Sequence, residues 1–137
     1  MRLTDKKIVW LCCGILVLIV FFNFLFIQLL LFDVFPYAGI VFHLAGGIAF
    51  GIGAYYLFLL HLVGLPWYII VCFIIGAVGL AAIGWEGFEW TFSQFYYNNL
   101  QGSLDNTMGD LCVGLLGGCI AAGWVVFRKR TAPKTVE

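Results

Sequence analysis

Four apolar stretches, each long enough to cross a lipid bilayer, account for most of this 137-residue chain. They run approximately over residues 8–32, 38–63, 66–92 and 106–127. An α-helix needs about 20 residues to cross a hydrocarbon core of about 30 Å. The stretches lack the apolar–polar alternation of membrane strands, so helices must satisfy their backbone hydrogen bonds. The sequence therefore predicts an all-α fold, a four-helix transmembrane bundle.

The composition excludes a water-soluble domain of this size. Hydrophobic residues make up 64% of the chain and charged residues 10%, and the mean hydropathy is +1.06. A soluble domain could not bury that much apolar surface. A net charge of zero argues against nucleic acid as a partner, because nucleic-acid-binding proteins carry basic patches. With neither a repeat nor a linker, residues 1–137 are expected to form a single polytopic membrane domain.

Basic residues orient the predicted bundle. Cytoplasmic segments of membrane proteins are enriched in Lys and Arg. The basic residues of this chain lie near both of its ends, which predicts that both termini are cytoplasmic. That arrangement requires an even number of spans, which four satisfies. The expected location is the plasma or bacterial inner membrane. The seven basic residues are Arg2, Lys6, Lys7, Arg128, Lys129, Arg130 and Lys134.

Four ionisable residues, His43, Glu86, Glu89 and Asp110, lie inside or at the rims of these apolar stretches. A charge at the centre of a membrane helix costs about 2.5–3.5 kcal/mol or more, so such residues usually mark a functional site. Counted along the predicted helices, His43 and Glu86 lie about 9 Å from the outer ends. Glu89 lies about one turn nearer the surface, and Asp110 about one turn into its helix. Three helices thus bring these residues to a similar depth.

The spacing of small residues predicts that these side chains face the bundle interior. Glu86 and Glu89 are three residues apart and share a helix face. Small residues repeated every four positions let membrane helices approach closely, so a polar residue in such a stripe should point inward. We therefore expect one polar cluster in the outer half of the bundle. The stripe on the second helix is Gly39, His43, Gly47 and Gly51, and that on the fourth is Asp110, Gly114, Gly117, Gly118 and Ala121.

Each of these residues also has a purely structural interpretation. Lipid headgroups could solvate Glu86 and Glu89 at the membrane surface. Asp110 could complement the positive end of its helix, and His43 could hydrogen-bond between helices. Together, the four favour a functional site over these separate explanations.

The start of the fourth helix carries residues typical of helix N-termini. Asp105 is expected to be the N-cap, with Ser103 as its competitor, because short oxygen-bearing side chains accept hydrogen bonds from the first backbone N–H groups. The helix would then continue through Asp110.

Three motifs resemble the VanZ-like and YjdF-like small bacterial membrane proteins: FHLAGG (42–47), GWEGFEW (84–90) and LQGSLDNTMGDLCVGLLGG (100–118). Those families carry a His in an early helix, a Glu-bearing helix end, and a Gly-lined helix opened by acids. In the related pattern D-T-x-x-D, Asp110 matches the second acid and Asn106 replaces the first. VanZ-like proteins are associated with low-level resistance to teicoplanin-type glycopeptides. The resemblance covers about residues 40–120, and it implies a cell-envelope role.

Two classes of function fit these residues. The first is a membrane-embedded enzyme or binder that acts on a lipid or lipid-linked cell-wall intermediate at the outer leaflet. Its imidazole and carboxylates, from His43, Glu86, Glu89 and Asp110, could bind Zn²⁺, Mn²⁺ or Fe²⁺ and so polarise a phosphate, or could serve as general acid and base. The carboxyl groups could instead stay protonated and hydrogen-bond with the imidazole.

The second class is a non-catalytic membrane scaffold. In that case the buried polar network only fixes the helix packing, and the outer loop docks a partner. Ion-coupled transport fits less well, because no polar residues continue the path to the cytoplasmic side.

Overall fold

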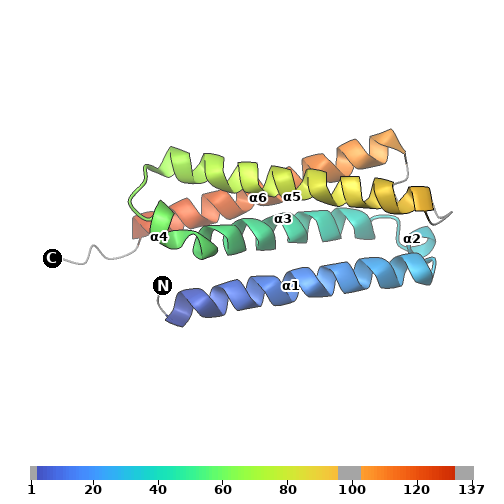
Figure 1. Cartoon of the computed structure of the whole chain (residues 1–137), viewed down its shortest axis with the longest axis horizontal. Helices are drawn as coiled ribbons and strands as arrows, with labels where there is room; N and C mark the ends of the chain where they lie inside the picture. The colour runs from blue at the N-terminus through green and yellow to red at the C-terminus, as the bar shows by residue number, and fades with distance from the viewer. Residues whose placement is uncertain (1–2, 96–102, 132–137) are drawn as a thin grey trace.

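The computed structural model describes residues 3–95 and 103–131, in which helices joined by short turns occur and no strand does. The four long helices run side by side along the length of the molecule (Figure 1). In chain order the helices are α1 (Leu3–Gln28), α2 (Leu31–Val34), α3 (Ala38–Leu57), α4 (Leu59–Leu62), α5 (Trp67–Phe95) and α6 (Leu104–Thr131).

Within the described residues, four helices are long and apolar enough to cross a membrane. This confirms the predicted all-α fold with four candidate spans. The start of α1 and the end of α6 lie at the same end of the bundle (Figure 1), as an even number of spans requires. We call this the terminal end, and the opposite end, where α3 and α6 begin, the far end. The basic residues Arg2 and Lys134 lie outside the described residues.

Two of the predicted helices are interrupted where the sequence predicted continuous segments. The first, predicted over 8–32, ends at Gln28, because Leu30 adopts a left-handed backbone conformation (φ 53°, ψ 31°). Such a residue cannot continue a right-handed helix, and the short α2 follows it. The second, predicted over 38–63, breaks at Phe58 (φ −98°, ψ 15°), which separates α3 from α4. Apolar residues flank both breaks, so hydropathy does not reveal them.

The other predicted boundaries differ by a few residues. Helix α1 begins five residues before the predicted position 8, and α6 extends to Thr131 rather than 127. Both extensions carry charged residues. Hydropathy leaves such residues out of a predicted span, but a helix can continue through them beyond the hydrocarbon core. Basic residues in the last turn of α6 also favour a helix C-terminus, because they complement the negative end of the helix dipole. Helix α5 covers 67–95 rather than 66–92.

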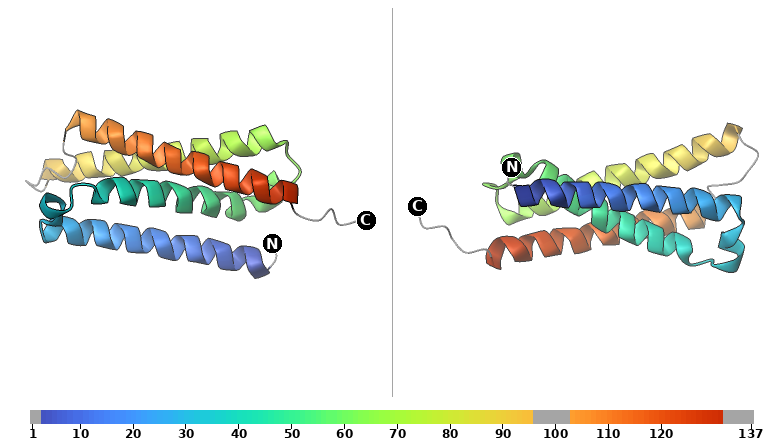
Figure 2. Two further views of the ribbon diagram at one scale, coloured as in Figure 1. Left: turned by 180° about the vertical axis from the view of Figure 1, so that it is seen from behind. Right: turned by 90° about the horizontal axis from the view of Figure 1, so that it is seen from below.

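Helix α3 is the centre of the bundle. It packs against α1, α5 and α6, whereas α1 packs mainly against α3. Figure 2 shows α1 along one side of α3, with α5 and α6 together on the other. The main apolar core lies toward the terminal end, between α3, α5 and α6. Its buried residues are Tyr55, Leu62, Ile70, Ile74, Val78, Ala121, Ala122 and Val125.

Glycines bring the backbones of α3 and α6 into direct contact at Gly47, Gly114 and Gly117. A Cβ atom on Gly47 would collide with the backbone of Gly114, and one on Gly117 would lie 2.5 Å from the carbonyl oxygen of Leu44. Real Cβ atoms do not come so close, so only glycine fits at these positions. Gly39, the first residue of the predicted stripe, has open space around it, and its predicted packing role was wrong.

Candidate functional site

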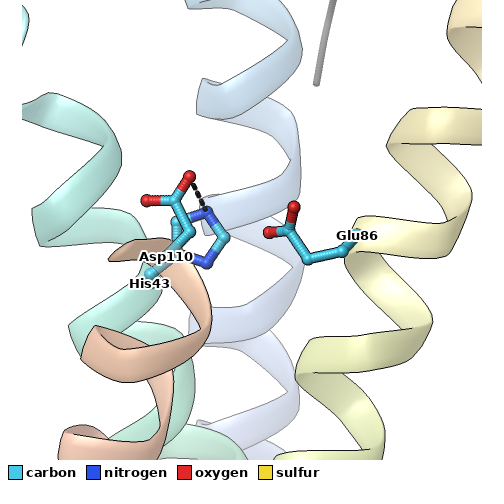
Figure 3. A group of neighbouring side chains, drawn as sticks. All are labelled: His43, Glu86 and Asp110. Atoms are coloured by element: carbon cyan, nitrogen blue, oxygen red, sulfur yellow. Dashed lines mark ion pairs between the residues drawn. The ribbon is translucent and has the colours of Figure 1, made fainter. Parts of the chain in front are cut away.

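Three of the four predicted site residues converge between three helices. His43 comes from α3, Glu86 from α5 and Asp110 from α6, and one possible ligand atom of each lies within 4.8 Å of the other two. His43 Nε2 lies 3.7 Å from Asp110 Oδ2. Figure 3 shows the Glu86 carboxylate directed across the interior toward the other two side chains. We call His43, Glu86 and Asp110 the His–carboxylate cluster.

The cluster lies in the far-end half of the bundle. His43 is five residues from the start of α3 and Asp110 six from the start of α6, which correspond to about 8–9 Å along the helix axis. Glu86 is nine residues from the end of α5, about 14 Å, because this helix continues past its predicted end. Three helices that are distant in sequence therefore deliver these groups to one layer.

Burial contradicts the interpretation that lipid headgroups solvate the acids. Glu86 is only 5% exposed, Glu89 7% and Asp110 8%, and this burial comes from the protein's own helices. Asp110 also lies beyond the first turn of α6, where the effect of the helix dipole has largely decayed. Neither the surface nor the helix end therefore explains these residues.

Glu86 is the member of the cluster whose carboxyl group has no hydrogen bond within the described chain. Neither of its carboxylate oxygens has a hydrogen-bond partner among the described residues, and the buried Thr107 hydroxyl also lacks one there. Asp110, by contrast, accepts a hydrogen bond of 2.7 Å from Asn106 Nδ2. Leaving a buried polar group unpaired costs about 1–3 kcal/mol, and more for a charge. The described part of the chain therefore gives Glu86 no hydrogen bond, and a donor near it is the unpaired hydroxyl of Thr107.

Glu89 does not join the three converging ligand atoms. Its Oε1 accepts a hydrogen bond of 2.8 Å from the indole N–H of Trp85, four residues earlier on α5. Glu89 shares a helix face with Glu86, as predicted, but a neighbour on its own helix already holds one oxygen of its carboxyl group.

Sequence reasoning missed the residues that hold the site in place. Asn106 and Trp85 each lie four residues before the carboxylate they contact, a spacing that places side chains side by side on a helix. The predicted N-cap was also wrong: Ser103 Oγ accepts a hydrogen bond of 3.2 Å from the Asn106 backbone N–H. Asp105 instead lies in the first turn of α6.

The fold and the site define a class of integral membrane protein: a bundle with four candidate spans and a buried cluster of one histidine and two carboxylates. The chain belongs to the family described as "Predicted membrane protein (DUF2238)", which matches residues 3–131. Neither the curated proteins nor the solved structures compared with the chain include a match. The family match confirms a small membrane-protein family, and it does not extend to the VanZ-like or YjdF-like names.

Proposed function

We propose that the His–carboxylate cluster binds a divalent cation inside the membrane and that the bound cation engages the phosphate of a lipid or lipid-linked envelope intermediate. One observation carries this proposal. The Glu86 carboxylate is buried without a hydrogen-bond partner in the described chain, and it converges with His43 and Asp110. A cation would satisfy it and would relieve the repulsion between the two acids.

The three side chains of the cluster would have to draw together to hold one small ion. Zn²⁺ lies about 2.0–2.2 Å from nitrogen and oxygen ligands in a tetrahedral site, so its ligand atoms lie about 3.3–3.6 Å from one another. The ligand atoms here lie within 4.8 Å of one another, so their separations would have to shorten by up to about 1.5 Å. Imidazole and carboxylate together suit Zn²⁺, Mn²⁺ or Fe²⁺. Three protein ligands leave coordination positions open for water or a phosphate oxygen.

The distribution of positive charge supports a role for the cation in phosphate binding. The described Lys and Arg residues lie in the first turns of α1 and the last turns of α6, at the terminal end. Without a bound cation, a phosphate at the cluster would lie beside two carboxyl groups, with no Lys or Arg of the described chain near it. The open positions suit both a binder and a hydrolytic enzyme. The VanZ-like resemblance favours a cell-envelope substrate, and with it an effect on glycopeptide tolerance.

We also propose that both termini are cytoplasmic in the cell membrane, which puts the cluster in the outer half. Basic residues at the terminal end support this orientation. Alkaline phosphatase, which is active only outside the cytoplasm, should be active when fused after Tyr37 and inactive when fused after Gly64. The reverse pattern would invert the bundle and move the cluster to the cytoplasmic half.

The cation itself can be tested with Mn²⁺, whose binding is measured by electron paramagnetic resonance on the full-length protein in detergent. The wild-type protein should bind one ion, and Glu86→Gln and His43→Ala should each weaken binding by at least about tenfold. His61→Ala removes a histidine at the terminal end and should leave binding unchanged. Glu89→Gln should also retain the ion, because Trp85 already holds that carboxylate. Equal binding by wild type and Glu86→Gln would refute the cation site.

A non-catalytic scaffold is the second candidate. The hydrogen bonds from Asn106 to Asp110 and from Trp85 to Glu89 support it, since such buried polar contacts can fix helix packing. A scaffold, however, leaves the unpaired Glu86 without a role. Under this alternative, cluster variants would lose folded protein and cations would have no effect.

A further inference from the structure

A half-open, largely apolar cavity of about 260 Å³ lies beside the cluster, on the side where α1 faces α3 and α5. Its walls come from residues within Leu16–Asn23 of α1, Phe42–Phe50 of α3 and Val78–Trp85 of α5. We call it the α1/α5 groove. Each wall spans eight or nine residues of helix, so the groove is about 10–12 Å long.

The sequence explains why this space is hollow. The α3 wall carries Gly46, and the α5 wall carries Ala81 and Ala82. A Cβ atom on Gly46 would meet nothing within 4 Å, so this position opens onto free space. These small residues therefore remove the side chains that would otherwise fill the gap.

An aromatic contact joins α1 to α5 on the far-end side of the groove. Phe24, the residue after Asn23, packs edge-to-face against Phe88 and Phe92, with ring centroids 6.3 Å apart in each pair. The hollow lies on the other side of this contact, toward the middle of the predicted spans. A molecule in the groove would therefore lie beside lipid hydrocarbon rather than in water.

Polarity along the groove has a direction. His43, a member of the cluster, lines its far-end part, whereas Leu16, Phe50 and Val78 line the part nearest the middle of the bundle. A membrane lipid has the same arrangement, with its polar head near one surface and its chain directed toward the bilayer centre. This match holds for whichever leaflet the far end faces.

A single hydrocarbon chain enters the groove more readily than a helix does, because a helix with its side chains is about 10 Å across and a hydrocarbon chain is much thinner.

We infer that the α1/α5 groove holds one hydrocarbon chain of a phosphate-bearing lipid whose head lies at the His–carboxylate cluster. The assignment of the head rests on the proposed cation site. The assignment of the chain rests on the groove, which adjoins the cluster through His43 and reaches toward the bilayer centre. The buried, unpartnered Glu86, which carries the proposed cation site, is the sign that a ligand head belongs beside the groove.

Photo-crosslinking locates the chain directly. The full-length protein is reconstituted in vesicles of phosphatidylethanolamine and phosphatidylglycerol that contain a small fraction of phosphatidylglycerol with a mid-chain diazirine, in the presence of Mn²⁺. Labelling of Ala81 and Ala82, inside the groove, should saturate as the probe fraction rises. Labelling of Leu80 and Ile83, which are exposed on the same helix, should rise in proportion to the probe, as for surrounding lipid.

A leucine at position 46 should fill the groove and leave the three ligand residues of the cluster in place. We expect Gly46→Leu to lower groove labelling severalfold while Mn²⁺ binding persists, which also shows that the variant folds. Gly76→Leu is the matched control, because Gly76 also has open space around it but lies outside the groove on an exposed part of α5. Groove labelling that does not saturate, or that Gly46→Leu leaves unchanged, overturns the inference.

The head and the chain are tested separately. A chelator and Glu86→Gln should each reduce groove labelling severalfold if the cation holds the head. Suppose that Gly46→Leu lowers groove labelling and the wild-type protein binds Mn²⁺, but neither the chelator nor Glu86→Gln changes the labelling. The head then lies elsewhere, and the inference as stated is wrong. If the wild-type protein binds no Mn²⁺, the proposed function fails, and this result is obtained without any lipid probe.

Discussion

Replacing Gly117 with alanine should destabilise the bundle by about 1–3 kcal/mol or prevent it from folding, which is the usual range for overpacking a tight interior. The new Cβ atom would lie 2.5 Å from Leu44 O and 2.9 Å from Ile48 N. Both atoms belong to the backbone of α3, which cannot move aside as a flexible side chain does. Helices α3 and α6 would have to separate, and the cluster that spans them would open.

Gly123→Ala is the matched control on the same helix. A Cβ atom there would meet nothing within 4 Å, and alanine favours a helix over glycine by about 0.5–1 kcal/mol. This variant should be as stable as the wild-type protein or slightly more so. Unfolding measured by circular dichroism in mixed micelles should separate the two substitutions. If both lowered stability equally, glycine content rather than the α3–α6 contact would be responsible.

The spans were predictable because their physical cause is local. An uninterrupted apolar stretch must be helical in a membrane, and this rule located all four long helices. The breaks at Leu30 and Phe58 were not predictable in the same way. Leucine and phenylalanine suit a membrane helix, so these breaks reflect how the chain turns between packed helices rather than any residue preference.

The sequence predicted which residues form the candidate site better than it predicted the hydrogen bonds they make. Residue counting gives depth and helix face, and these selected four residues, of which His43, Glu86 and Asp110 converge. The position of Glu89 depended on a competition that counting does not resolve: it lies three residues from Glu86 but four from Trp85. The indole N–H provides Glu89 with a hydrogen bond, and Glu86 offers it only a second carboxyl group.

The role of Asn106 was also not predictable from the sequence. Because Asn106 replaces the first acid of the related D-T-x-x-D pattern, the sequence suggested that a site residue had been lost. In the structure its amide donates a hydrogen bond to Asp110, which a carboxylate at this position could do only when protonated. An amide in place of the acid therefore leaves Asp110 oriented and removes one negative charge from the neighbourhood of the cluster.

Glu86→Met should be at least as stable as the wild-type protein in chelator and less stable than it when a cation is added. In chelator the wild-type protein carries a buried carboxyl group with no partner in the described chain, and the apolar methionine, of similar length, removes that cost. The variant should then be as stable as the wild-type protein or more stable, as is often found when buried charges are replaced by apolar groups. At a Mn²⁺ concentration about 100 times the dissociation constant, the wild-type protein should gain about 2.7 kcal/mol by mass action. The variant should gain nothing, so the order of the two should invert.

This inversion separates the cation site from the scaffold. If Glu86 only fixed helix packing, its replacement would lower the unfolding free energy by the same amount with and without Mn²⁺. His61→Ala controls for nonspecific effects of the metal, because this exposed residue lies far from the cluster, at the terminal end, and should follow the wild-type protein in both conditions. A ranking of wild type and Glu86→Met that is identical in chelator and in Mn²⁺ would therefore rule out a structural cation at the cluster. In that case the size of this side chain, which methionine retains, would matter for the packing of α5 against α3 and α6, and its charge would not.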